Sequence, residues 1–136
     1  MGRLKILYIF LLTVTFSGAS AQVRVRLFSN MSPESALFSV TEGKYKISAF
    51  NGENLIVGTG EPVIITRFNG KLAVKTRDAK GFFCDSVIFN GITGDDSFSL
   101  RNNRNIPVRQ FYSGDLMCYP DLETIVLINI CDVEKL

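Results

Sequence analysis

The chain has 136 residues, with 15 Lys or Arg, 13 Asp or Glu and no His, which gives a formal net charge of +2. This length allows one domain with a real core and excludes two such domains. The absence of histidine excludes Ser–His and Cys–His catalytic pairs and removes the most common zinc ligand.

The first 21 residues show the features of a secretory signal peptide in the expected order. Arg3 and Lys5 form a positive head, residues 6–16 are apolar, and Ala19-Ser20-Ala21 supplies the small residues of a cleavage site. The apolar segment has about 11 residues, whereas a membrane-spanning helix needs about 20. We therefore expect residues 1–21 to be a cleavable signal peptide. A helix at the start of a cytosolic protein is the alternative.

Residues 22–136 are expected to form the mature protein, a single β domain that is secreted or periplasmic and not integral to the membrane. Arg3 and Lys5 account for the excess of basic residues, so the mature part carries 13 basic and 13 acidic side chains. A neutral balance gives no electrostatic reason to expect nucleic acid as a partner.

Short runs of alternating apolar and polar residues fill the mature part, as half-buried strands do. These runs are rich in Val, Ile, Phe and Tyr, which favour strands. The sequence therefore predicts an all-β fold, a small antiparallel sandwich or barrel-like domain. In chain order, the expected strands are residues 23–27, 36–40, 44–50, 55–57, 63–68, 72–74, 86–89, 98–100, 108–111, 115–119 and 124–129.

Turn-forming dipeptides separate several of these runs. Asn51-Gly52, Asn69-Gly70 and Asn90-Gly91 are each expected to form a turn, because Asn and Gly accept positive φ angles. Asn69-Gly70, with alternating residues on both sides, is the best candidate for a two-residue hairpin. Residues 32–36 begin like a helix, but they run into strand-like residues, so we expect a turn there.

Residues 124–130 form the most apolar segment of the mature part. A continuous apolar run indicates a strand that is buried on both faces.

Cys84, Cys118 and Cys131 form an odd set for an exported chain. Apolar residues surround each of them, which favours burial as small apolar side chains. One disulfide with one free thiol is the alternative.

The remaining candidates for catalysis are carboxylic acids, because glycan cleavage needs at least one well-placed acid. Most lie in or beside expected turns, where turn chemistry explains them, and residues 94–97 lack the ligand spacing of a calcium loop. We therefore expect no catalytic residue, no metal and no cofactor. The acids considered are Asp95, Asp96, Asp115, Asp121, Glu123, Asp132 and Glu134.

Residues 112–116, Tyr-Ser-Gly-Asp-Leu, and residues 126–135 resemble the middle of the domain family of stage II sporulation protein D and the amidase enhancer LytB. That family shows a Y-x-G-x-L strand, a hydrophobic strand that ends in Asn, and an acidic segment before its catalytic part. Residues 23–28 resemble its opening strand and residues 43–47 its G-x-Y-x-V strand. The matches to the family motif, which are the candidate binding residues, are Tyr112, Gly114, Asn129 and Glu134.

Members of this family act on peptidoglycan, either as lytic transglycosylases or by stimulating amidases. The resemblance implies that residues 22–136 are the N-terminal β part of such a domain, truncated before the segment with the catalytic Glu. Glu134 matches the acidic residue before that segment and not the catalytic acid. The resemblance thus predicts an exported, cell-wall-associated protein that binds peptidoglycan or a cell-wall protein and does not cleave glycan by itself.

The alternative is a small secreted β-sandwich that binds a carbohydrate or a protein and never belonged to an enzyme. Tyr112 and Tyr119 are then the side chains expected to stack on a sugar, since the chain has no Trp. A complete enzyme is the least favoured reading.

Overall fold

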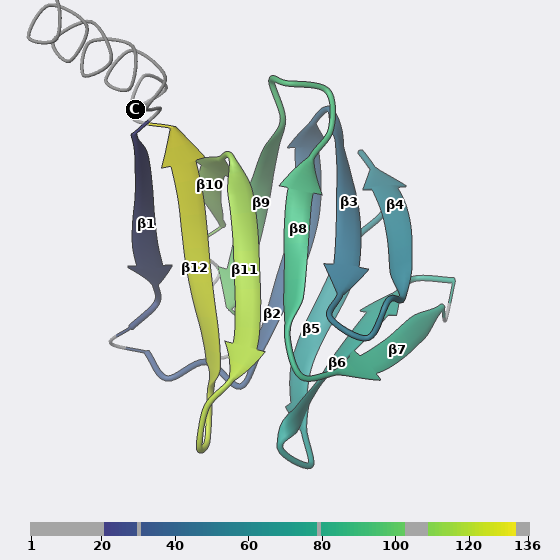
Figure 1. The fold of residues 1–136 in the computed structure, drawn as a ribbon, viewed down its shortest axis with the longest axis vertical. Helices are drawn as coiled ribbons and strands as arrows, with labels where there is room; N and C mark the ends of the chain where they lie inside the picture. The colour runs from purple at the N-terminus through teal and green to yellow at the C-terminus, as the bar shows by residue number, and fades with distance from the viewer. Residues whose placement is uncertain (1–20, 30, 79, 103–108, 133–136) are drawn as a thin grey trace, which may run out of the picture.

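The computed structural model describes residues 21–29, 31–78, 80–102 and 109–132. These residues form two six-stranded antiparallel sheets that pack face to face (Figure 1). The all-β prediction is confirmed, and the architecture is a sandwich rather than a closed barrel. Within the described ranges, no helix is long and apolar enough to cross a membrane.

The first sheet has the strand order β1-β12-β11-β8-β3-β4. Its two edge strands, β1 and β4, come from the N-terminal half of the described chain, and β12 pairs with β1 along six residues of each strand. The strands are β1 (Gln22–Leu27), β3 (Lys44–Ala49), β4 (Asn54–Gly58), β8 (Val87–Gly91), β11 (Asp115–Pro120) and β12 (Ile125–Asp132).

The second sheet has the strand order β10-β9-β2-β5-β6-β7. Its edges are β10 and the short strand β7, and its centre is the pair formed by β2 and β5. The strands are β2 (Ser35–Glu42), β5 (Val63–Phe68), β6 (Lys71–Thr76), β7 (Gly81–Cys84), β9 (Ser97–Asn102) and β10 (Gln110–Ser113).

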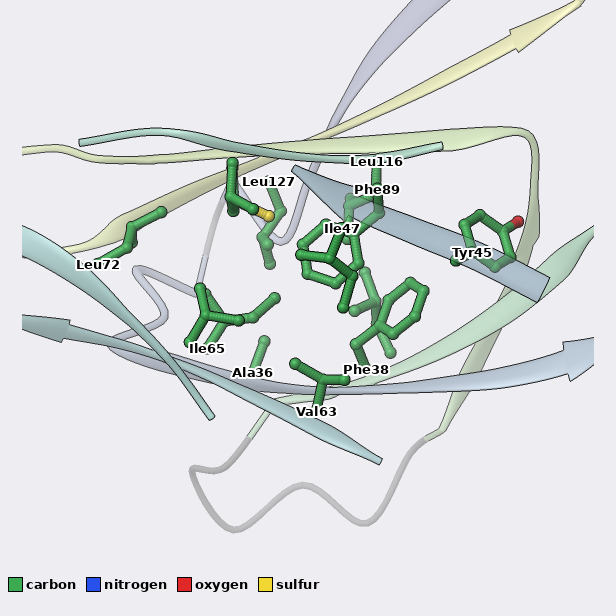
Figure 2. Close-up of a cluster of buried hydrophobic side chains, with 14 of the residues drawn as sticks. Ala36, Phe38, Tyr45, Ile47, Val63, Ile65, Leu72, Phe89, Leu116 and Leu127 are labelled. Carbon is green, nitrogen blue, oxygen red and sulfur yellow. The ribbon is translucent and has the colours of Figure 1, made fainter. Parts of the chain in front are cut away.

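The core lies between the sheets and consists of every second residue of most strands. Figure 2 shows Ile47 and Phe89 of the first sheet above Phe38 and Val63 of the second. The ring of Phe38 lies 4.4 Å from that of Phe89, centroid to centroid, and it also packs against Tyr45 at 5.3 Å. Aromatic pairs of this kind add roughly 0.5–1.5 kcal/mol each beyond the burial of their area.

The hairpin predicted at Asn69-Gly70 is confirmed. β5 ends at Phe68, β6 begins at Lys71, and these two residues are register partners. Asn69 has a φ of 51° and Gly70 a φ of 74°, and two successive positive φ values are what a tight hairpin turn with the twist of its strands requires.

The turn predicted at Asn90-Gly91 is wrong, because both residues belong to β8. Gly91 is instead required for close packing: a Cβ atom there would lie 2.6 Å from Oδ2 of Asp96. The sequence analysis also missed β7 (Gly81–Cys84), which is only four residues long.

The prediction of a doubly buried strand near residue 124 is confirmed in β12. Leu127 points into the core, while Val126 and Ile130 are only 2% and 9% exposed although they lie on the opposite face of the strand. β12 also continues beyond the expected end at Asn129 to Asp132. The three cysteines are buried, as their apolar neighbours predict, and they are free thiols.

Candidate functional site

Three connections between the sheets meet at one end of the sandwich, the upper end in Figure 1. The chain passes from β2 to β3 at Gly43, from β8 to β9 over residues 92–96, and from β10 to β11 at Gly114. Three of the residues that the sequence analysis singled out, Asp95, Asp96 and Gly114, lie in these connections. Their contacts therefore decide whether this end is a functional site.

Asp96 is the centre of the first two connections and is only 7% exposed. Its carboxylate accepts hydrogen bonds from the backbone N–H groups of Lys44 at 3.0 Å, Thr93 at 3.0 Å and Gly94 at 2.9 Å, and from the hydroxyl of Thr93. Burial raises the pKa of Asp96, but these donors together lower it by more. The pKa of Asp96 therefore lies below the usual value. Asp96 is thus held ionised and is unsuited to donate a proton.

Glycine residues leave the space that this carboxylate occupies. A Cβ atom on Gly43 would contact Oδ1 of Asp96, and one on Gly91 would lie 2.6 Å from Oδ2. Gly43 also has a φ of 77°, which side chains rarely adopt. Asp96 thus joins the two connections as a structural anchor.

The third connection brings together two of the predicted site residues. The side-chain amide of Asn129 donates to the carbonyl oxygens of Ser113 at 2.9 Å and Asp115 at 3.0 Å, one on each side of Gly114. The hydroxyl of Tyr45 donates to the carbonyl oxygen of Gly114 itself at 2.7 Å. Gly114 and Asn129 therefore shape a corner of the fold.

Tyr112 lies on β10 and not in one strand with Leu116, because the chain changes sheets at Gly114. Its ring packs against that of Phe98, with the ring centroids 5.6 Å apart. Glu134, the fourth predicted site residue, lies outside the described residues.

Sequence reasoning missed Tyr45, which is completely buried. Burial raises its pKa far above the usual value, and the negative charges of Asp96 and Asp115 raise it further. Tyr45 is therefore a neutral donor. Only its position in an alternating strand signalled that it would be buried.

An acid-lined hollow of about 480 Å³ opens at this end, between the three connections. Asp115 is already engaged, since it accepts a hydrogen bond of 2.9 Å from the N–H of Gly91. Asp132 pairs with Gln22 in the sheet, and Asp95 is exposed. Within the described residues, no three acidic or cysteine side chains are placed to hold a metal ion. The contacts thus describe a structural junction.

A different region exposes aromatic rings to solvent. Phe68, at the end of β5, and Phe83, on the edge strand β7, are 53% and 56% exposed. Their rings lie 5.7 Å apart, centroid to centroid, at an angle of 34°. Ala73 is the register partner of Phe83 on the strand between them, and its small side chain leaves the rings room to meet. We call Ile64, Phe68 and Phe83 the aromatic patch; Ile64 is 46% exposed.

Basic side chains flank the aromatic patch. Lys71 is the register partner of Phe68 and Lys75 that of Ile64, and both lysines are exposed. Strands β5, β6 and β7 contain no acidic residue. The outer face of these three strands is therefore apolar and positively charged, in contrast to the acidic end described above.

The adjacent residues Phe82 and Phe83 are the sequence signal for an exposed ring, and the sequence analysis did not use it. Successive side chains of a strand point to opposite faces, so one of the two rings had to point outward.

Comparison with models of protein families, with curated proteins and with solved structures found no match to this chain. The resemblance to the sporulation protein D and LytB family therefore stays a prediction.

Proposed function

We propose that this protein is an exported, non-catalytic binding module, and that its aromatic patch binds a glycan that carries carboxylates, as cell-wall peptidoglycan does. The observation that carries the proposal is the pair of adjacent exposed rings, Phe68 and Phe83, between two exposed lysines.

Exposed apolar side chains that adjoin one another mark binding surfaces more often than scattered ones do. Here the two rings contact each other, and Ile64 is a further exposed apolar side chain on the same face of β5. Aromatic side chains are also among those that contribute most to binding, because they bury a large area with few rotatable bonds. The C–H face of a sugar ring is apolar and suits such a surface.

Lys71 and Lys75 provide the second part of the argument. Each can donate charged hydrogen bonds to a carboxylate, which are stronger than neutral ones. The absence of acids in β5 to β7 leaves these charges uncompensated on their own strands. A glycan with carboxylates fits this face better than a neutral glycan does.

The proposal assigns no chemical step to the protein. A glycan-cleaving acid must hold a proton near neutral pH, which requires a raised pKa. Asp96, the buried acid of the described chain, has instead a lowered pKa because four hydrogen-bond donors reach its carboxylate. The signal-peptide pattern of residues 1–21 and the resemblance to a peptidoglycan-directed family support the proposed location and ligand.

Sedimentation of the purified protein with isolated peptidoglycan sacculi tests the proposal. We expect binding, and we expect Phe83→Ala to weaken it about 10-fold, the effect of losing one important aromatic contact. Phe111→Ala is the matched control: this ring is 66% exposed but lies on β10, at the opposite edge of the same sheet. No binding, or an equal loss in the control variant, would contradict the proposal.

The variant Lys75→Gln and competition by neutral sugars test whether charge contributes to binding. The lysine variant should weaken binding and reduce its dependence on salt, since salt screens exposed charges. Lys46→Gln, on the outer face of the other sheet, should leave binding unchanged. If neutral chitin oligosaccharides compete as well as soluble peptidoglycan fragments, carboxylates are not recognised. Sedimentation with crude cell walls but not with protease-treated sacculi would instead indicate a protein partner.

A further inference from the structure

Strand β1 is held to the rest of the protein mainly through its ladder with β12. It lies at the edge of the first sheet, and β12 is its neighbour there. Of the residues of β1, Leu27 alone is buried, and Val25 is 44% exposed. Removal of β1 from the sandwich therefore uncovers little of the core and breaks one strand ladder.

The connection from β1 to β2 contains two residues in a strained backbone conformation. Phe28 has a φ of 53° and Ser32 a φ of 44°. The left-handed region is unfavourable for a bulky aromatic residue, and a residue that precedes proline, as Ser32 precedes Pro33, prefers an extended conformation. Asn69, the third described non-glycine residue with a positive φ, is of a type that accepts it. Among these three residues, the strain thus belongs to the two that follow β1.

The folded monomer holds both strained residues in place. Phe28 packs against the core, and its carbonyl oxygen accepts a hydrogen bond of 3.0 Å from the N–H of Met31, which closes a turn. The carbonyl oxygen of Pro33 accepts one of 2.8 Å from the N–H of Ile125. Strain of this kind persists only where surrounding contacts impose it, so an extended connection would release it.

Departure of β1 would leave β12 with an open edge. The N–H and C=O groups of β12 that face β1 would then lack partners, along a strand that is mostly apolar. An unpaired edge is a template for a strand from another chain. β1 of a second copy fits this edge, because its pairings, from Gln22 with Asp132 to Leu27 with Leu127, are those that β12 already makes.

We propose that two copies of this protein form a dimer by exchanging β1, so that β1 of each copy pairs with β12 of the other. The dimer keeps the same ladder and the same burial of Leu27, whereas Phe28 and Ser32 leave the left-handed region as the connection extends. A connection between β1 and β2 of this length spans up to about 24 Å, enough to reach a neighbouring sandwich. Exchange of an identical segment is a low-cost route to a dimer, because it needs no new complementary surface.

The exchange leaves the aromatic patch accessible on both copies. β1 lies at one edge of the first sheet, whereas the patch belongs to β5 and β7 of the second sheet, toward the opposite side of the sandwich (Figure 1). A dimer thus presents two patches, and one glycan polymer that engages both is bound more tightly. This consequence rests on the proposed function, whereas the dimer itself does not.

Refolding at different protein concentrations tests the exchange in the absence of any glycan. Purified protein that begins at Gln22 is refolded from urea with a reductant and analysed by size-exclusion chromatography with light scattering. We expect monomer from the dilute sample and a rising share of dimer as the protein concentration increases. Monomer alone at every concentration would overturn the proposal, whatever the result of the sacculus assay.

The double variant Arg26→Cys, Ile128→Cys identifies which chain supplies β1. These two residues are register partners, so their Cα atoms lie about 4.5–5.5 Å apart, within the range of a disulfide. After oxidation, the dimer fraction should run as a covalent dimer in non-reducing electrophoresis, and the monomer fraction as a single chain with an internal bond. A dimer in which the new bond is internal to each chain associates through another surface and would refute the exchange.

Ser32→Gly tests whether strain drives the exchange. Glycine adopts a positive φ without steric cost, so this variant stabilises the monomer, and the association constant of the dimer should fall at least about 10-fold. Ser86→Gly is the matched control, because Ser86 lies in the connection from β7 to β8 and is not among the described residues with a positive φ. The control should keep the wild-type share of dimer. No fall in Ser32→Gly, or an equal fall in both variants, would contradict the proposal.

Discussion

The hydroxyl of Tyr45 donates a hydrogen bond of 2.7 Å to the carbonyl oxygen of Gly114, 69 residues later in the chain. Tyr45 lies on β3 of the first sheet, and Gly114 is the residue at which the chain leaves the second sheet for the first. The bond therefore ties a central strand to an inter-sheet corner. It gives the carbonyl oxygen of Gly114 a hydrogen-bond partner at a place where the fully buried tyrosine lies against it.

Tyr45→Phe removes this donor and keeps the ring. We expect the free energy of unfolding to fall by about 1–2 kcal/mol, because the carbonyl oxygen of Gly114 loses its partner. Urea unfolding followed by circular dichroism measures the change. Tyr119→Phe is the control, since Tyr119 is 37% exposed and water can replace its contacts. Equal losses in the two variants would show that the corner bond contributes nothing specific.

Gly114→Ala should be far more damaging than its size suggests. Gly114 has a φ of 85°, and a Cβ atom there would contact the carbonyl oxygen of Ile130. Strain and steric overlap together should cost about 3 kcal/mol or more. Gly52→Ala separates the two causes: Gly52 has a φ of 95° but open space around it, so we expect about 1 kcal/mol. Thermal unfolding of both variants tests the difference.

Asp96 should make stability depend on pH in the acid range. Its pKa is lowered in the folded protein, so its contribution is fully present above the unfolded carboxyl value of about 3.9 and is lost as pH falls through the folded value. Asp96→Asn should remove this dependence and also lower stability near neutral pH, because an amide nitrogen would face backbone donors. Urea midpoints measured from pH 7 down to pH 2 give the comparison.

The control for this series is Asp95→Asn, in which the exposed neighbour of Asp96 is changed. Asp95→Asn should leave the loss of stability at acid pH unchanged. If the wild-type curve and the Asp96→Asn curve remain parallel below pH 4, the hydrogen bonds to the carboxylate do not stabilise the ionised form.

Export predicts the identity of the first residue of the mature protein. Expression in a host with an active secretion pathway should give secreted or periplasmic material that begins at Gln22, because cleavage follows Ala19-Ser20-Ala21. Intact-mass spectrometry identifies the terminus. Recovery of the protein only from the cytosol, with Met1 still present, would refute the leader.

The amino-acid sequence was sufficient to locate most of the strands and the best hairpin turn. Alternation of apolar and polar residues reports which side chains share a face, so it located strands such as β5, whose bounds Val63–Phe68 match the expected range. Asn69-Gly70 identified its hairpin because the conformation of a two-residue turn depends on those residues alone. Both signals are local.

The contacts of Gly91, Gly114 and Asn129 could be seen only in the folded chain, because their partners are distant in the sequence. Asn90-Gly91 has the composition of a turn, yet Gly91 stays in β8 because the Asp96 carboxylate fills the place of its side chain. Gly114 and Asn129, two of the candidate binding residues, form a corner between the sheets. The aromatic patch likewise exists because β5 and β7 are brought to either side of the small side chain of Ala73. Alternation shows that side chains share a face, whereas the order of strands in the sheet decides which of them meet.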